Sequence, residues 1–270
     1  MKTILFPIRS ASKTNELLKY VGSLAQDAHA KVSLISMETS KQKVMAISGT
    51  HFSTEVSHSP HLNDTYDYLC RIAHVPSDIV EENINLGDTY KKLGAIADRH
   101  DVMIVPLASD YHAHSGQFDL TKAINETNVP LLLIPDEFKY KKIKCLIYAY
   151  DFKHEPDPPL SKLSQVASWF GAEVRFISIF SKDALTKERD KVHELHIQLL
   201  NAWKGGNKIS FDTIVYPHVP KFEEHYLGQP EQGDLQVLSV SSQSFLDRLL
   251  RRGLMEGIQH SKSPYLVIHK

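Results

Sequence analysis

The stretch Asp101-Val-Met-Ile-Val-Pro-Leu107, with Val129-Pro-Leu-Leu-Leu-Ile-Pro135 a short distance after it, decides the fold. Each run is almost continuously apolar and bounded by polar residues, which is typical of a strand buried on both faces of a parallel sheet. Between them, residues 108–116 are polar and turn-rich, and residues 119–127 place apolar side chains at helical spacing. The stretch therefore predicts strand, loop, helix and strand. In an open α/β sheet, a ligand binds at the loop of such a unit.

The composition is that of a globular protein without a strong charge. The chain has 270 residues, of which 42% are hydrophobic and 23% charged, and its formal net charge is -1. Because nucleic-acid and membrane-surface binding depend on a basic surface, we expect neither partner. No apolar run approaches the roughly 20 residues that cross a bilayer, and Arg9 interrupts the first one, which predicts a cytoplasmic protein. Cys70 and Cys145 lie far apart in apolar surroundings, and we expect both to be reduced.

The sequence contains two copies of one α/β unit. Four strand-like segments of the first copy recur in the same order in the second: 4–9 with 146–151, 31–37 with 173–179, 101–107 with 234–240, and 129–135 with 263–269. The alternation of strands and helices predicts right-handed crossovers and a mostly parallel sheet between helices. We therefore expect two domains, 1–137 and 142–270. Their last strands should pair or pack across a pseudo-twofold axis, which protects two sheet edges.

Several short pieces carry a resemblance to a known family. They are Ile4-Leu-Phe-Pro7, Gly87-Asp88 before a helix, and the run from Val129 in the first copy, with Cys145-Leu-Ile-Tyr-Ala-Tyr-Asp151 in the second. Their order, repeated twice, resembles a tandem universal stress protein. The resemblance implies two flavodoxin-like or Rossmann-like domains of the adenine nucleotide alpha hydrolase type. Each would hold a five-stranded sheet, and the two would form a pseudo-dimer. It also implies a role in stress response and, in many members, an ATP site.

The ATP-site pattern of the family is missing here. Nucleotide-binding members carry Gly-x-x-Gly and, about nine residues later, Gly-Ser or Gly-Thr, because glycines let backbone N–H groups approach the phosphates. The corresponding loop of the first copy holds one glycine, Gly116, and the acidic Asp110. The loop of the second copy, Ser239-Val-Ser-Ser-Gln-Ser-Phe-Leu-Asp247, holds none. We therefore expect no cofactor and, in particular, no ATP bound in the way usual for the family.

If a nucleotide does bind, the second copy is the better candidate. The resemblance implies an aspartate after the first strand, and this position is Arg9 in the first copy but Asp151 in the second. Ser239, Ser241 and Ser242 add hydroxyl groups before a predicted helix, where they could hold an anion or simply cap the helix. Two hypotheses follow. One is a non-catalytic stress-response protein that binds an unknown protein partner or small ligand. The other is a nucleotide-responsive switch or weak ATPase that uses the second copy only.

Two histidines form the one candidate metal site in a predicted ligand loop. His112 and His114 have a spacing that lets both rings face one side of an extended segment, and Asp110 could be a third ligand. A solvated loop that happens to hold two histidines is the alternative that we favour. The sequence has no Gly-x-Ser-x-Gly, His-Glu-x-x-His or Gly-x-x-x-x-Gly-Lys motif, so we expect that the protein is not an enzyme. Pairing of whole chains into a homodimer is left open.

Overall fold

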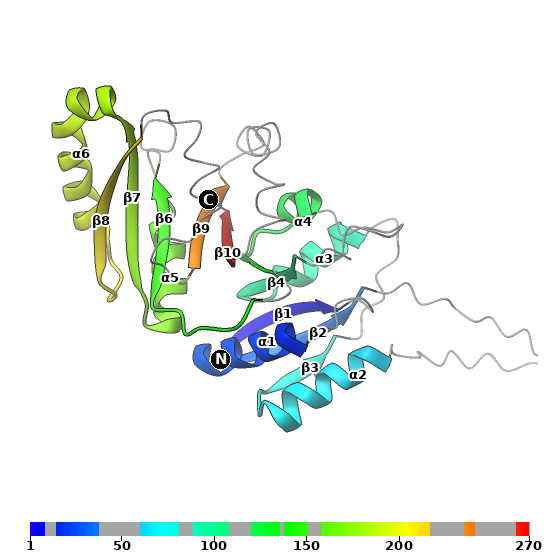
Figure 1. Ribbon diagram of the computed structural model, residues 1–270. Coiled ribbons are helices and arrows are strands. Elements are labelled where there is room, and N and C mark those ends of the chain that lie inside the picture. The colour runs from blue at the N-terminus through cyan, green and yellow to red at the C-terminus, as the bar shows by residue number, and fades with distance from the viewer. Residues whose placement is uncertain are drawn as a thin grey trace, which may run out of the picture.

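The computed structural model shows a ten-stranded sheet flanked by helices (Figure 1). It describes residues 1–8, 15–37, 60–80, 89–107, 120–135, 138–150, 158–216, 235–240 and 263–269. The elements of the first half are β1 Lys2–Ile8, α1 Asn15–Ala28, β2 Ala30–Ser36, α2 Pro60–Asp67, the π-helix η1 Tyr68–Ile72, β3 Ser77–Ile79, α3 Thr89–Ala97, β4 Val102–Pro106, α4 Leu120–Glu126 and β5 Leu131–Ile134. Those of the second half are β6 Cys145–Tyr150, α5 Leu160–Phe170, β7 Glu173–Ser181, α6 Lys182–Ala202, β8 Ile209–Tyr216, β9 Leu235–Val240 and β10 Tyr265–His269.

The sheet consists of two halves with the same strand order. Its strands run β3-β2-β1-β4-β5-β10-β9-β6-β7-β8, so the last five repeat the order of the first five in reverse. All neighbouring strands are parallel except β5 and β10, which are antiparallel, with Leu131 opposite Val267 and Leu133 opposite Tyr265. The predicted α/β pseudo-dimer and the pairing of its last strands are thus confirmed. The domain boundaries at residues 137 and 142 stay a prediction.

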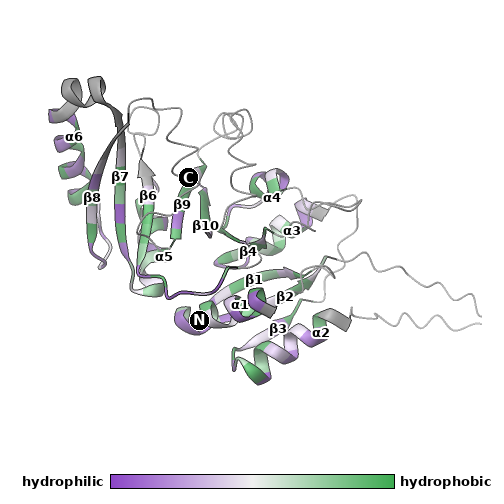
Figure 2. Ribbon diagram, viewed as in Figure 1, coloured by the Kyte–Doolittle hydropathy of each residue, from purple (hydrophilic) through white to green (hydrophobic). Residues whose placement is uncertain are grey.

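Helices cover both faces of the sheet. On one face, a single hydrophobic cluster includes side chains from α1, α2, η1, α5 and α6 and so runs through both halves. On the other face, α3 and α4 pack on the first half through the residues predicted to be buried, Leu93, Ile96 and Ala97 on α3 and Leu120, Ala123 and Ile124 on α4. In Figure 2 the central strands are hydrophobic along most of their length, whereas α6 is largely hydrophilic. Burial of apolar area across both halves makes the chain one packed unit.

Three local contacts join the halves and the segment between them. The Lys2 ammonium donates to the carbonyl oxygens of Ala28 at 3.0 Å and Trp169 at 3.5 Å, at the C-terminal ends of α1 and α5. A cation there interacts favourably with both helix dipoles. The Tyr140 hydroxyl, between β5 and β6, donates to Asp27 of α1 at 2.6 Å. The Tyr140 ring meets buried Tyr20 edge to face, with centroids 5.2 Å apart. The connecting segment is therefore fixed against α1.

Three sequence predictions need correction. The helical spacing of Val192, Leu195, Leu199 and Leu200 predicts that all four face the sheet, but Leu200 is 55% exposed. Val192 and Leu199, seven residues apart, define the buried face of α6, and Leu200 lies about 80° around the helix from Val192. Residues 63–73 are predicted from the sequence to form a helix, but the helix that begins at Pro60 becomes a π-helix at Tyr68, where one turn holds an extra residue. The strand β8 was not predicted. Polar and apolar residues alternate over its first half, Ile209 to Asp212, as in an edge strand with one solvated face. The expected free thiols are confirmed for Cys70 and Cys145.

Candidate functional site

The carboxyl ends of β6, β9 and β10 lie side by side in the second half of the sheet. Tyr148 of β6 is aligned with Val237 of β9, and Ser239 of β9 with Ile268 of β10. The register therefore brings the end of β6 next to Ser239. In open α/β sheets, ligands bind outside the carboxyl ends of the strands. This edge of the second half is the first candidate site.

Ser239 gives this edge a buried polar group. Its residue is 5% exposed, and its hydroxyl has no hydrogen-bond partner within the part of the chain that the structure describes. Leu235 and Val237, which share its face of β9, belong to the core that α5 covers. A buried hydroxyl that lacks a partner costs roughly 1–3 kcal/mol. The end of β9 thus has hydrogen-bonding capacity that a ligand or water can use.

The other predicted site residues lie in segments outside the described residues. Asp151, Ser241 and Ser242, the remaining candidates for nucleotide binding, lie outside the described residues. The same holds for His112 and His114, the candidate metal ligands. Both sites therefore stay predictions. Among the residues that are described, no group of three or more His, Cys, Asp or Glu side chains could hold a metal ion.

His269 ends β10 close to the first half of the chain. Its pKa is lowered to about 4, chiefly by burial and also by nearby Lys162, while Asp98 beyond the end of α3 opposes the shift. The Lys162 ammonium donates to the His269 carbonyl oxygen at 2.6 Å, and the ring Nε2 has no partner among the residues described. The imidazole is therefore neutral at physiological pH. His269 was not among the predicted site residues, because a histidine at the end of a strand does not reveal from sequence alone whether it is buried.

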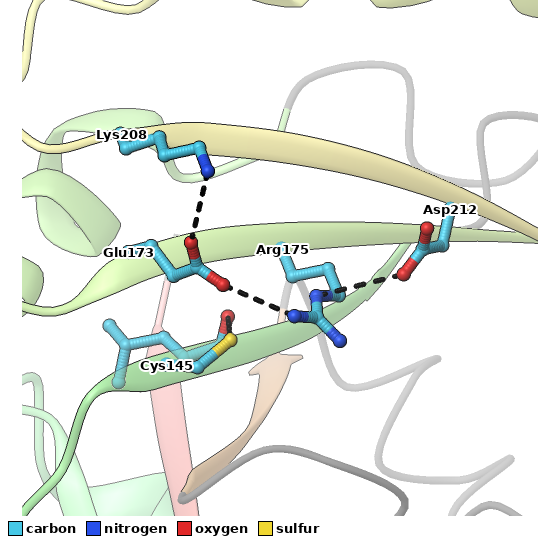
Figure 3. Close-up of polar contacts among 6 residues, drawn as sticks. Cys145, Glu173, Arg175, Lys208 and Asp212 are labelled. Atoms are coloured by element: carbon cyan, nitrogen blue, oxygen red, sulfur yellow. Dashed lines mark hydrogen bonds and ion pairs between the residues drawn. The ribbon is translucent and has the colours of Figure 1, made fainter.

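A second polar cluster lies at the opposite edge of the sheet, at the amino ends of β6, β7 and β8. It surrounds a solvent-open concavity of about 690 Å³, which we call the Arg175 hollow. The residues that line it are Lys144, Cys145, Gly171, Ala172, Glu173, Arg175, Gly206, Asn207 and Lys208. Figure 3 shows Arg175 between the carboxylates of Glu173 and Asp212. The nitrogen–oxygen distances are 3.1 Å to Glu173 and 3.6 Å to Asp212, and the Lys208 ammonium lies 3.9 Å from Glu173.

The sequence holds a faint signal for this cluster. In β7, Glu173 and Arg175 alternate with the buried Val174 and Phe176, which places both charges on one face of the strand. The neighbouring strand β8 adds Asp212 to the same face, but β8 itself was not predicted from the sequence. Without that strand, the charges could not be brought together. The cluster was therefore missed.

His196 of α6 takes a structural role. Its ring stacks on Phe211 of β8 with centroids 4.5 Å apart, and its Nε2 lies 3.5 Å from the buried Ser178 hydroxyl. Burial lowers the pKa of His196, and His193 one turn earlier lowers it further. Because His196 turns inward while His193 is exposed, the two do not form a chelating pair.

Solved structures of other proteins share this arrangement of strands and helices. A universal stress protein from Archaeoglobus fulgidus matches with a TM-score of 0.56 at 14% identity, over 99% of this chain and 96% of that one. A protein described as a universal stress protein from Pseudomonas aeruginosa matches with a TM-score of 0.58 at 12% identity, over 99% and 93%. This chain has the universal stress protein fold. The match covers both halves, as the repeat in the sequence predicts.

The universal stress protein fold occurs in more than one setting. The cytoplasmic domain of a prokaryotic cation chloride cotransporter matches with a TM-score of 0.52 at 14% identity, over 98% of this chain and 94% of that one. No family model and no curated protein matches the sequence. Within the described ranges, every helix is too short or too polar to cross a membrane.

Proposed function

We propose that this chain is a non-catalytic protein of the universal stress type. It acts in stress response by binding a protein partner or a small ligand, and it does not hold ATP in the way usual for that family. One observation carries this proposal. The strand order makes β4 and β9 the fourth strands of their halves. The segments that follow them, 107–116 and 241–247, therefore correspond to the phosphate loops of the family. The first segment contains one glycine, and the second contains no glycine.

The setting supports a binding role without fixing the partner. The same fold serves as the cytoplasmic domain of a cation chloride cotransporter, so it is not tied to one enzymatic reaction. A near-neutral charge disfavours nucleic acid, and the protein would act in the cytoplasm. The pairing of β5 with β10 occupies the edges through which two separate domains would otherwise associate.

The second candidate function is an adenine-nucleotide switch or weak ATPase in the second half. The buried Ser239 hydroxyl, which has no hydrogen-bond partner among the described residues, favours it, since it lies at the end of β9 where a ligand would bind. Asp151, directly after β6, would then meet the nucleotide, and Ser241 and Ser242 would meet its phosphates.

Thermal unfolding of metal-stripped protein separates the two functions. A ligand at 100 times its Kd adds about 2.7 kcal/mol to the free energy of unfolding. We expect no shift in Tm with ATP and magnesium or with AMP that depends on Asp151. A shift with ATP that disappears in Asp151→Ala, but persists in the control Asp190→Ala on the exposed part of α6, would overturn the first function in favour of the second. A shift with zinc or nickel alone would point to His112 and His114.

A further inference from the structure

The Arg175 hollow is separate from the candidate site at Ser239, because it lies at the amino ends of the strands. We propose that it binds a small anion bearing carboxylate or phosphate groups, with Arg175 as the central contact. Its volume of about 690 Å³ falls within the roughly 300–1,000 Å³ typical of small-molecule sites. A binding site there is independent of whether the second half binds a nucleotide.

Positive charge dominates the lining of the Arg175 hollow. Lys144, Arg175 and Lys208 contribute cations, and Glu173 is the one carboxylate among the described lining residues. Asp212, which is not part of the lining, reaches Arg175 from β8. An excess of one charge inside a concave surface raises the local concentration of the opposite ion. The hollow therefore attracts anions although the whole chain is near neutral.

Arg175 is held in place but only weakly neutralised. Its side chain is 23% exposed, so its guanidinium is oriented by the protein and still reachable. One nitrogen–oxygen contact of 3.1 Å joins it to Glu173, and the 3.6 Å distance to Asp212 exceeds that of an ordinary hydrogen bond. The Asp212 side chain is 55% exposed, so its ion pair with Arg175 contributes little. A carboxylate or phosphate that binds the guanidinium with two oxygens makes shorter and stronger hydrogen bonds. An incoming anion can thus replace these contacts.

Two glycines border the hollow. A Cβ atom added at Gly171 or Gly206 would meet no described atom within 4 Å, so the hollow is open in front of both. Gly171 also has a φ of +62°, which glycine adopts without strain. It ends α5 in the left-handed conformation and so starts β7 at the edge of the hollow. A ligand can therefore approach the backbone closely at these two positions of the lining.

The first half shows what the same corner looks like without such a site. By strand register, Lys31 and Ser33 of β2 correspond to Glu173 and Arg175 of β7. Lys31 is paired with Asp78 at 2.6 Å, and a serine stands in place of the arginine. The anion site therefore belongs to the second half only, and Lys31 offers a matched control.

The test is thermal unfolding of the full chain titrated with inorganic phosphate and, separately, with citrate, at constant ionic strength set with sodium chloride. We expect a saturable rise in Tm with at least one of them, and which one responds identifies the anion class. Arg175→Gln should abolish the rise, and Lys208→Ala should raise the apparent Kd about threefold. Glu173→Gln should lower the apparent Kd, because it removes the competing carboxylate. Lys31→Gln should leave the response unchanged.

Lys208→Ala and Glu173→Gln should change the apparent Kd in opposite directions. These two variants therefore test the site even if Arg175→Gln folds poorly. Phosphate also stabilises proteins in general by its exclusion from their surfaces. An equal rise in Arg175→Gln and in the unmodified chain would therefore overturn the proposal. So would the lack of any response to both anions, or a weaker response in Glu173→Gln.

Discussion

Replacement of Gly94 by alanine tests how closely α3 and α4 pack. A Cβ atom at this position would collide with the backbone carbonyl of Glu126, and no side-chain rotation can relieve that contact. The two helices must separate by about 1 Å, and overpacking of this kind costs roughly 1–3 kcal/mol. Alanine in place of a helical glycine returns about 1 kcal/mol. Because the obstacle is backbone, we expect the upper part of that range and a net loss of about 2 kcal/mol in the free energy of unfolding.

Gly22 of α1 is the matched control. It is also a helical glycine facing another segment, but its added Cβ would lie 3.0 Å from the Ala73 side chain. A shift of a few tenths of an ångström relieves that contact, so the helical gain offsets it and Gly22→Ala should be near neutral. Urea unfolding followed by circular dichroism measures both variants. The reasoning is refuted if Gly94→Ala is as stable as the unmodified chain, or if Gly22→Ala loses as much as Gly94→Ala.

Three further predictions concern pH and the contacts between the halves. His269 has a folded-state pKa of about 4, below the 6.5 of an exposed histidine, so the stability linked to its neutral form is present above pH 6.5 and is lost toward pH 4. With a discount for its partial exposure, we expect the chain to lose about 1 kcal/mol more in a pH scan of its stability between pH 7 and pH 5 than His269→Gln does. Lys2→Met leaves the carbonyls at the ends of α1 and α5 without their donor and should lower stability by about 1 kcal/mol in urea unfolding, whereas an unchanged midpoint would show that this bridge is neutral. Tyr140→Phe keeps the ring contact with Tyr20 but removes the hydrogen bond to Asp27, so we expect the free energy of unfolding to fall by about 1 kcal/mol. Adding Asp27→Asn to this variant should cause no further loss.

The sequence was most informative where burial is periodic. The strands β1, β4 and β5 and the inward faces of α1, α3 and α4 follow from apolar runs and helical spacing, because each element presents a uniform surface to one core. The antiparallel contact of β5 with β10 was also predictable, since two copies of one unit leave two equivalent edges. The repeat therefore determined the architecture more firmly than any single motif did.

The candidate sites were less predictable for a physical reason. The Arg175 hollow depends on β8 lying next to β7, which brings Asp212 to Arg175 although the two are far apart in the sequence. The low pKa of His269 depends on burial between β10 and residues of the first half. Sequence periodicity describes one element at a time, so contacts between distant elements are invisible to it. Ser239 was identified because its position at the end of a strand is itself a local feature.

The antiparallel joint between β5 and β10 also affects how this molecule can change over evolutionary time. In a homodimer of identical subunits, every mutation appears twice, on both sides of the symmetry axis. Here the two sides belong to one chain and are encoded separately, so each can drift alone while the joint keeps them together. The pairs Lys31 and Glu173, and Ser33 and Arg175, are positions where this has led to different residues. A tandem chain can thus keep one half as a scaffold while the other acquires a new surface.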